Sequence, residues 1–246
     1  NGLGTDLSMW EPQVTELSRE FRVLRYDTRG HGASATSTGP FGIEHLGRDV
    51  LALLDHVGAH HAHFCGLSMG GMIGMWLGIH APQRLQKLVL AHTAAWIGPQ
   101  TMWNDRIEVV RAHGMSAISG AAIVRWFTPE FIVRAPGIVA ALKASMERTP
   151  VDGYIGCCAA IRDADFRNDV ARIATPTLVI SGTSDIATPP ADGRFLASRI
   201  GGAESVEFDA AHLSNVELPQ DFTAALLRYL GLARASPSMQ RTASVS

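Results

Sequence analysis

One nine-residue stretch constrains this chain more than any other: residues 63–71, which read His-Phe-Cys-Gly-Leu-Ser-Met-Gly-Gly. Gly66, Ser68 and Gly70 form the pattern G-x-S-x-G, in which a strand turns sharply into a helix and holds the serine hydroxyl at the tip of the turn. Glycine on either side of the serine leaves room for the close backbone approach that such a strained turn requires. The pattern by itself is weak, so the sequence around it has to decide.

The flanks of Ser68 support this interpretation. Residues 62–65 form a short, mostly apolar run that predicts a buried strand, and residues 69–80 predict a helix that ends before Pro82. This helix contains several glycines, which weaken an isolated helix, so we expect it to pack closely against a sheet. A structural turn that merely contains a serine is the alternative.

Strands and helices alternate along the rest of the chain. Strands are predicted over residues 21–26, 62–65, 85–91, 177–182 and 205–208, and helices over residues 9–18, 43–57, 69–80, 191–200 and 218–230. Elements of these lengths in this order indicate an α/β fold with a mainly parallel, doubly wound sheet and right-handed crossovers. A chain of 246 residues is long enough for one large domain of this kind with an insertion.

Residues 96–170 interrupt the alternation. Four segments there have a helical pattern, over residues 101–113, 117–127, 138–148 and 152–162, and none has a convincing strand pattern. We interpret this part as a helical cap, a lid over Ser68, inserted between a first core part at 1–95 and a second at 171–232. The tail at 233–246 is rich in serine and has little hydrophobic pattern, so we expect it to be disordered.

A serine hydroxyl needs a base beside it, and the base needs an orienting acid. His212 follows the last predicted strand and is the only histidine after the cap, and Asp185 follows the strand before it. Both therefore fall at the carboxyl edge of the sheet, toward which the turn at Ser68 also points. The order serine, acid, histidine predicts these three as catalytic residues, with Asp209 and Asp192 as fallback acids. A turn-forming aspartate and a packed histidine are the alternatives.

Covalent acyl transfer also needs N–H donors for the developing oxyanion. We expect the backbone amide of Met69, at the start of the helix after the serine, to be one of them. The amide of Leu3, in the glycine-rich loop at the beginning of the chain, is the expected second donor. A plain glycine-rich turn is the alternative for this loop.

Composition argues against several other classes of protein. A formal net charge of −2 gives no reason to expect nucleic acid or a membrane as a partner, and no apolar run reaches the ~20 residues of a membrane span. The three cysteines are an odd number with two adjacent, which is no disulfide framework and favours a cytoplasmic location. His60, His61 and His63 have no carboxylate or cysteine at ligand spacing, so we expect no metal site there.

The chain resembles the α/β-hydrolases, and among them the 3-oxoadipate enol-lactonases. Three regions carry the resemblance: the loop NGLGTDLSMW at 1–10, the turn FCGLSMGGM at 64–72, and the loops GTSDIATPP at 182–190 and DAAHLSN at 209–215. It covers about residues 1–230 and implies an α/β-hydrolase fold with a helical cap. The family has further strands before the first loop, so we expect N-terminal strands to be missing from this chain. Gly2 is the other departure, because relatives usually carry a side chain there.

The resemblance also implies a reaction. Ser68 would open 3-oxoadipate enol-lactone to 3-oxoadipate in the catabolism of aromatic compounds, with no metal and no cofactor. The expected partner is therefore a small anionic lactone, and the oligomeric state stays open. Because this substrate carries a carboxylate, the cap should offer a cation, and Arg125 with Trp126, and Arg134, are the candidates. Solvated arginines with Trp126 in the core are the alternative.

Other functions would use the same three catalytic residues. A general carboxylesterase, a C–C bond hydrolase or a cofactor-free perhydrolase would differ from a lactonase in cap shape rather than in motif. Ser68 argues against a haloalkane dehalogenase, which needs a carboxylate nucleophile at this position. A ligand receptor with a hydrolase fold, or an inactive fragment, are further alternatives.

Overall fold

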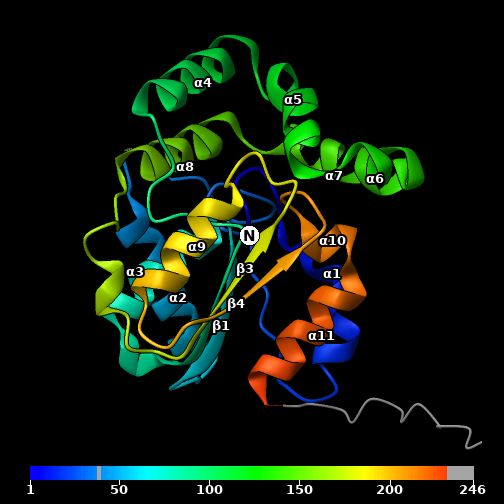
Figure 1. Cartoon of the computed structure of the whole chain (residues 1–246). Coiled ribbons are helices and arrows are strands. Elements are labelled where there is room, and N and C mark those ends of the chain that lie inside the picture. Colours follow the sequence, from blue (N-terminus) through cyan, green and yellow to red (C-terminus); the bar gives the residue numbers. More distant parts are fainter. Residues whose placement is uncertain (38–39, 232–246) are drawn as a thin grey trace, which may run out of the picture.

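A parallel sheet forms the centre of the computed structural model, which describes residues 1–37 and 40–231 (Figure 1). The four strands of this sheet are β1 (Ala62–Leu67), β2 (Leu85–Ala91), β3 (Thr177–Gly182) and β4 (Glu204–Phe208), and they lie in the order β1-β2-β3-β4. All neighbouring pairs are parallel: Leu67 lies opposite Ala91, and Gly182 lies opposite Phe208. The carboxyl ends of the strands therefore meet at one edge of the sheet.

Helices cover both faces of this sheet, as Figure 1 shows. One side carries α2 (Ile43–His56), α3 (Met69–His80) and α9 (Pro190–Arg199), and the other carries α1 (Glu11–Leu17), α10 (Ser214–Glu217) and α11 (Pro219–Leu230). Short 3₁₀ helices lie at Leu7–Trp10, Pro82–Arg84 and Val170–Arg172. Helix α3 connects β1 to β2, and α9 connects β3 to β4. The predicted α/β arrangement with a doubly wound parallel sheet is confirmed.

Five helices between β2 and β3 gather beyond the carboxyl edge of the sheet (Figure 1, green). They are α4 (Gln100–His113), α5 (Ser116–Trp126), α6 (Pro129–Arg134), α7 (Pro136–Arg148) and α8 (Val151–Asp163). Helix α4 packs against α8, and α5 against α7. Four of the five correspond to the predicted helices. Helix α6 was not predicted because six residues are too few for a periodic pattern, although the Thr128 hydroxyl caps it and Pro129 begins it.

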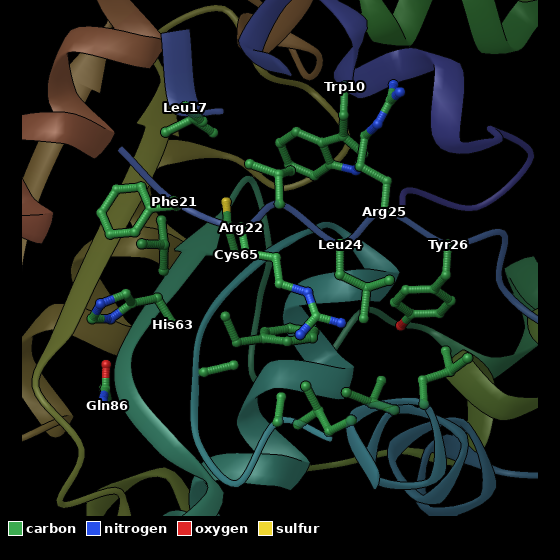
Figure 2. Close-up of a pocket in the computed structure, with 18 of the residues that line it drawn as sticks. Trp10, Leu17, Phe21, Arg22, Leu24, Arg25, Tyr26, His63, Cys65 and Gln86 are labelled. Atoms are coloured by element: carbon green, nitrogen blue, oxygen red, sulfur yellow. The ribbon is translucent and has the colours of Figure 1, made fainter. Parts of the chain in front are cut away.

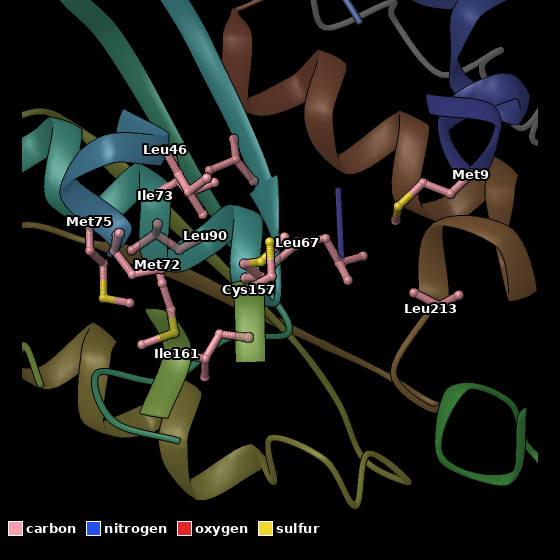
Figure 3. Close-up of a cluster of buried hydrophobic side chains, with 14 of the residues drawn as sticks. Met9, Leu46, Leu67, Met72, Ile73, Met75, Leu90, Cys157, Ile161 and Leu213 are labelled. Atoms are coloured by element: carbon pink, nitrogen blue, oxygen red, sulfur yellow. The ribbon is translucent and has the colours of Figure 1, made fainter. Parts of the chain in front are cut away.

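The core is densest where α3 meets the sheet. Figure 3 shows Met72, Ile73 and Met75 of α3 beside Leu90 of β2, and all four side chains are fully buried. An added Cβ on Gly74 would lie 3.1–3.2 Å from side-chain atoms of both strands that flank it. Glycine at this position therefore allows the close helix–sheet packing that the sequence predicts.

Residues 21–26 form no strand, which makes that prediction wrong. Within the described residues β1 pairs with β2 alone, and a cavity of about 600 Å³ separates residues 21–26 from β1. Figure 2 shows Leu24 on one side of this cavity, and His63 and Cys65 on the other. The alternating pattern of 21–26 is that of a strand, but a strand also needs a neighbour within hydrogen-bonding distance, and here the cavity takes that place.

Some expectations stay predictions. The tail at 233–246, for which we predict disorder, lies outside the described residues. The division into core parts at 1–95 and 171–232 with a cap at 96–170 is likewise still a prediction. No helix in the described ranges combines the length and the apolar character needed to cross a membrane.

Candidate active site

Ser68 lies between the end of β1 and the start of α3, in a backbone conformation that side chains rarely adopt. Its φ is 58° and its ψ is −115°. An added Cβ on Gly66 would lie 2.0 Å from the carbonyl oxygen of Gly70, and one on Gly70 would lie 3.0 Å from the carbonyl oxygen of Asn1. The Thr93 hydroxyl donates to the carbonyl of Ser68 at 2.8 Å. The structure thus contains the strained turn that the sequence predicts.

Asp185 and His212 reach the same edge of the sheet from two loops, one after β3 and the other after β4. Asp185 Oδ2 lies 2.8 Å from His212 Nδ1, and Oδ1 accepts hydrogen bonds from the amides of Ala187 at 2.8 Å and Thr188 at 3.0 Å. Burial alone would raise the pKa of the Asp185 carboxyl, but the charge and hydrogen bond of His212 hold that pKa far below its usual range. The carboxylate is therefore ionised.

Ser68 and His212 line one cavity of about 270 Å³. Within the described part of the chain no hydrogen bond joins the Ser68 hydroxyl to His212, and such bonds often tighten only when substrate binds. Because Nδ1 of His212 faces Asp185, its other ring nitrogen, Nε2, is left to accept a proton from a nucleophile. The arrangement can therefore support nucleophilic attack by the serine.

Two backbone amides beside Ser68 have no acceptor among the described residues. Leu3 lines the same cavity, Met69 begins α3, and neither amide donates to a protein atom in the residues that the structure describes. The loop that carries Leu3 is held against the serine, because an added Cβ on Gly2 would lie 3.8 Å from Ser68 Cβ and the amide of Gly70 donates to Asn1 O at 3.0 Å. Free amides in this position suit an oxyanion.

Two of the three predicted substrate-binding residues lie at the cavity. Arg125 and Trp126, at the end of α5, line it, and Trp126 is also largely buried. Arg134 is not brought there: its guanidinium lies 5.4 Å from the centre of the Phe131 ring and donates to the carbonyl of Glu217 at 3.5 Å.

A second arginine, Arg106 of α4, lines the cavity as well, and no pattern in the sequence indicated it. Its guanidinium lies 4.6 Å from the centre of the Trp103 ring, one helical turn away. Neither Arg106 nor Arg125 forms a salt bridge with any carboxylate in the described ranges. Burial, and next the charge of Arg106, lower the pKa of Arg125. Two cations without counter-charges at one cavity are typical of an anion-binding site.

A further buried histidine, His92, was not among the site residues predicted from the sequence either. It follows β2 directly, at the same edge as the other site residues, and its φ is 46°. Its Nδ1 lies 3.0 Å from Asp185 Oδ2, and its Nε2 lies 2.6 Å from the hydroxyl of Ser214. The one available signal in the sequence was its position immediately after a strand.

His92, Asp185 and His212 could in principle hold a metal ion, because their potential ligand atoms lie within 4.8 Å of one another. A histidine nitrogen that binds a metal must have lost its proton. Here both Nδ1 atoms lie at hydrogen-bonding distance, 2.8–3.0 Å, from the same ionised carboxylate oxygen, to which a protonated Nδ1 donates. We therefore interpret the cluster as a hydrogen-bond network.

The fold and this site together define an α/β hydrolase, and a family model described as "alpha/beta hydrolase fold" matches residues 1–113. Over 92% of its length the chain is 46% identical to 3-oxoadipate enol-lactonase 2 of Acinetobacter baylyi, of which it covers 85%. The chain belongs to the 3-oxoadipate enol-lactonase family.

Solved structures share the fold of this chain. The enol-lactonase from Burkholderia xenovorans LB400 is 47% identical, with a TM-score of 0.92 over 94% of this chain and 88% of that one. A thermophilic esterase from Thermogutta terrifontis is 28% identical, with a TM-score of 0.89 over 93% and 86% of the two chains. The resemblance found in the sequence is confirmed.

Proposed function

We propose that this enzyme hydrolyses 3-oxoadipate enol-lactone to 3-oxoadipate in the degradation of aromatic compounds, with Ser68, His212 and Asp185 as its catalytic triad. The observation that carries the proposal is the 2.8 Å contact between Asp185 and His212 at a cavity that Ser68 also lines. This geometry supplies a nucleophile, a base and an orienting acid in a chain of the enol-lactonase family.

The reaction proceeds through an acyl-enzyme. Ser68 Oγ attacks the lactone carbonyl carbon while His212 Nε2 accepts the hydroxyl proton and Asp185 stabilises the imidazolium. The amides of Leu3 and Met69 bind the oxyanion. When the tetrahedral intermediate collapses, the ring C–O bond breaks and the leaving enolate, still attached through its carbon chain, takes the proton from His212 and becomes a ketone. His212 then activates a water that releases 3-oxoadipate and restores the serine.

Arg125 and Arg106 bind the free carboxylate of the substrate. Both line the cavity from cap helices, and neither is neutralised by a carboxylate of the described chain. Trp126 beside Arg125 offers an apolar surface to the hydrocarbon part of the lactone. This pair of arginines, the carboxylate clamp, would favour an anionic lactone over a neutral ester. Such a preference would distinguish the enzyme from a general carboxylesterase.

Comparing two substrates tests the function. Hydrolysis of 3-oxoadipate enol-lactone is followed as loss of ultraviolet absorbance, beside hydrolysis of p-nitrophenyl acetate. A strong preference in kcat/KM for the lactone supports the proposal. Turnover of the ester alone would keep the triad and reject the substrate.

Substitution of Arg106 and Arg125 tests whether the carboxylate clamp binds the substrate. Arg106→Ala and Arg125→Ala should each lower kcat/KM for the lactone by about 10- to 100-fold, the range expected for a hydrogen bond to a charged group. Both should change kcat/KM for the neutral ester by less than about twofold, since that ester has no carboxylate. Arg134→Ala is the matched control and should affect neither substrate. Equal losses on both substrates would reject the clamp.

We also place the enzyme in the cytoplasm. Cys65, Cys157 and Cys158 are free thiols, and burial raises the pKa of Cys65 and of Cys158 to about 12. Unpaired cysteines support a reducing compartment. Cell fractionation should recover the lactonase activity with cytoplasmic markers, and recovery in another fraction would reject this location.

A further inference from the structure

One carboxylate oxygen of Asp185 serves two histidines. Oδ2 lies 2.8 Å from Nδ1 of His212 and 3.0 Å from Nδ1 of His92, and the Thr188 hydroxyl donates to it at 3.0 Å. A ring nitrogen without a proton would direct a lone pair at this negative oxygen, so both Nδ1 atoms carry a proton and donate. The structure therefore determines the tautomer of His92.

Ser214 holds His92 in this tautomer. With the proton on Nδ1, the Nε2 of His92 is an acceptor, and the Ser214 hydroxyl, 2.6 Å away, donates to it. The His92 side chain is completely buried, and its ring lies edge-on to that of His212, with centres 5.8 Å apart and an angle of 75° between the planes. Gly182 makes room for the ring, because an added Cβ there would lie 3.0 Å from His92 Cε1.

We propose that His92 is a positioning residue for hydrolysis: held by Ser214, it donates to Asp185 Oδ2 and so controls how that oxygen is oriented toward His212 and how strongly it binds the imidazolium. His92 is not among the residues that line the cavity, so it acts through Asp185 and touches no substrate. The inference rests on the proposed function in one respect, because it takes His212 as the base.

The direction of the effect follows from charge. A donor on Oδ2 withdraws electron density that the oxygen would otherwise direct to His212, so the network holds the imidazolium less tightly than an Asp–His pair alone. Removing the donor should strengthen that hold, and the base would then need a higher pH to lose its proton. The acidic limb of the kcat/KM profile should move upward.

His92 itself does not change charge over this range. Asp185 and His212 face it from the loops after β3 and β4, and Glu217 is the charged group on α10. Burial lowers the pKa of His92, an effect that outweighs the opposing influence of Asp185, so the ring stays neutral at the pH of the assay. A shift of the limb therefore reports on the base.

Three variants test the proposal with p-nitrophenyl acetate, whose hydrolysis does not depend on the lactone assignment. His92→Leu removes the donor and should move the acidic limb of kcat/KM upward by about half a pH unit. His92→Asn keeps an N–H close to the position of Nδ1 and should restore the limb to within about 0.2 pH units of the parent. Ser214→Ala leaves Nε2 without its donor and should move the limb in the same direction as His92→Leu, by less.

Proton NMR gives a second readout. The parent enzyme should show two low-field imidazole N–H resonances, one for each histidine that donates to Asp185. His92→Asn should remove one of them and keep the other. A parent spectrum in which His92 contributes no such resonance would overturn the proposal.

A purely structural role makes a different prediction. If His92→Leu lowers the melting temperature but leaves the limb unchanged, His92 only packs and the proposal is refuted. If the leucine variant does not fold, the acidic limb of Ser214→Ala and the low-field resonances of His92→Asn test the proposal instead, and an unchanged limb in Ser214→Ala refutes it. A parent that hydrolyses the ester but not the lactone would defeat the proposed substrate alone, whereas ester hydrolysis that survives Ser68→Ala would defeat the triad and this inference with it.

Discussion

Replacing Asp185 with asparagine should reverse the proton arrangement of the triad. The amides of Ala187 and Thr188 donate to Oδ1 at 2.8 and 3.0 Å and cannot move their protons, whereas the imidazoles and the hydroxyl that donate to Oδ2 can, so the amide oxygen of the new residue would keep the Oδ1 position. Its NH₂ group would then replace Oδ2 and meet the Nδ1–H groups of His212 and His92, donors against a donor at 2.8 and 3.0 Å. The His212 ring relieves this conflict by moving its proton to Nε2, and no acceptor remains for the proton of Ser68.

The loss of kcat should be large, because the variant keeps its fold but His212 can no longer act as a base. The same substitution lowers kcat by about 10⁴ in a well-known serine protease triad, which corresponds to about 5.5 kcal/mol of transition-state stabilisation. We expect a loss of that order for Asp185→Asn, measured as kcat for p-nitrophenyl acetate at pH 7. The melting temperature, measured in parallel, should show that the variant is folded.

Asp209→Asn is the matched control for this experiment. Asp209 accepts a hydrogen bond from the Thr183 hydroxyl at 3.0 Å, in an exposed position, and its replacement should change kcat by less than about twofold. A loss of only a few fold at Asp185, or a loss of about 10⁴ at Asp209 or at Asp192, would refute the assignment of the acid.

Three further outcomes are expected. Ser68→Ala should abolish ester hydrolysis with an unchanged circular dichroism spectrum, and residual activity within tenfold of the parent would reject the nucleophile. Gly66→Ala should lower the free energy of unfolding by about 3 kcal/mol, because its Cβ would lie 2.0 Å from the Gly70 carbonyl oxygen, whereas Gly120→Ala, where nothing lies within 4 Å, should be neutral or stabilising. Burial lowers the pKa of the His31 imidazole from 6.5 to about 4. As the pH falls, the unfolded chain therefore binds a proton at this histidine before the folded protein does, and the free energy of unfolding should decrease between about pH 6.5 and pH 4. Between pH 7 and 5 the parent should lose about 2 kcal/mol more than His31→Gln in urea denaturation, and equal losses would contradict the buried neutral form.

Local pattern was sufficient for most of the secondary structure. Helix α3 at 69–80 and strand β2 at 85–91 have the predicted bounds, because apolar period, glycine and proline mark these limits within a few residues. Residues 21–26 show where this reasoning fails. Their alternation is real, but a strand exists only when a neighbour completes the ladder, and nothing within the segment specifies that neighbour.

The sequence by itself determined the turn at Ser68 and the loops that carry Asp185 and His212, because turn sterics are local and parallel strands all end at one edge of a sheet. Only the tertiary structure decided that His92 shares the carboxylate and that Arg106 faces the cavity. The physical reason is distance along the chain. His92 and Asp185 are 93 positions apart, and their contact arises from the packing of whole elements, which no local pattern encodes.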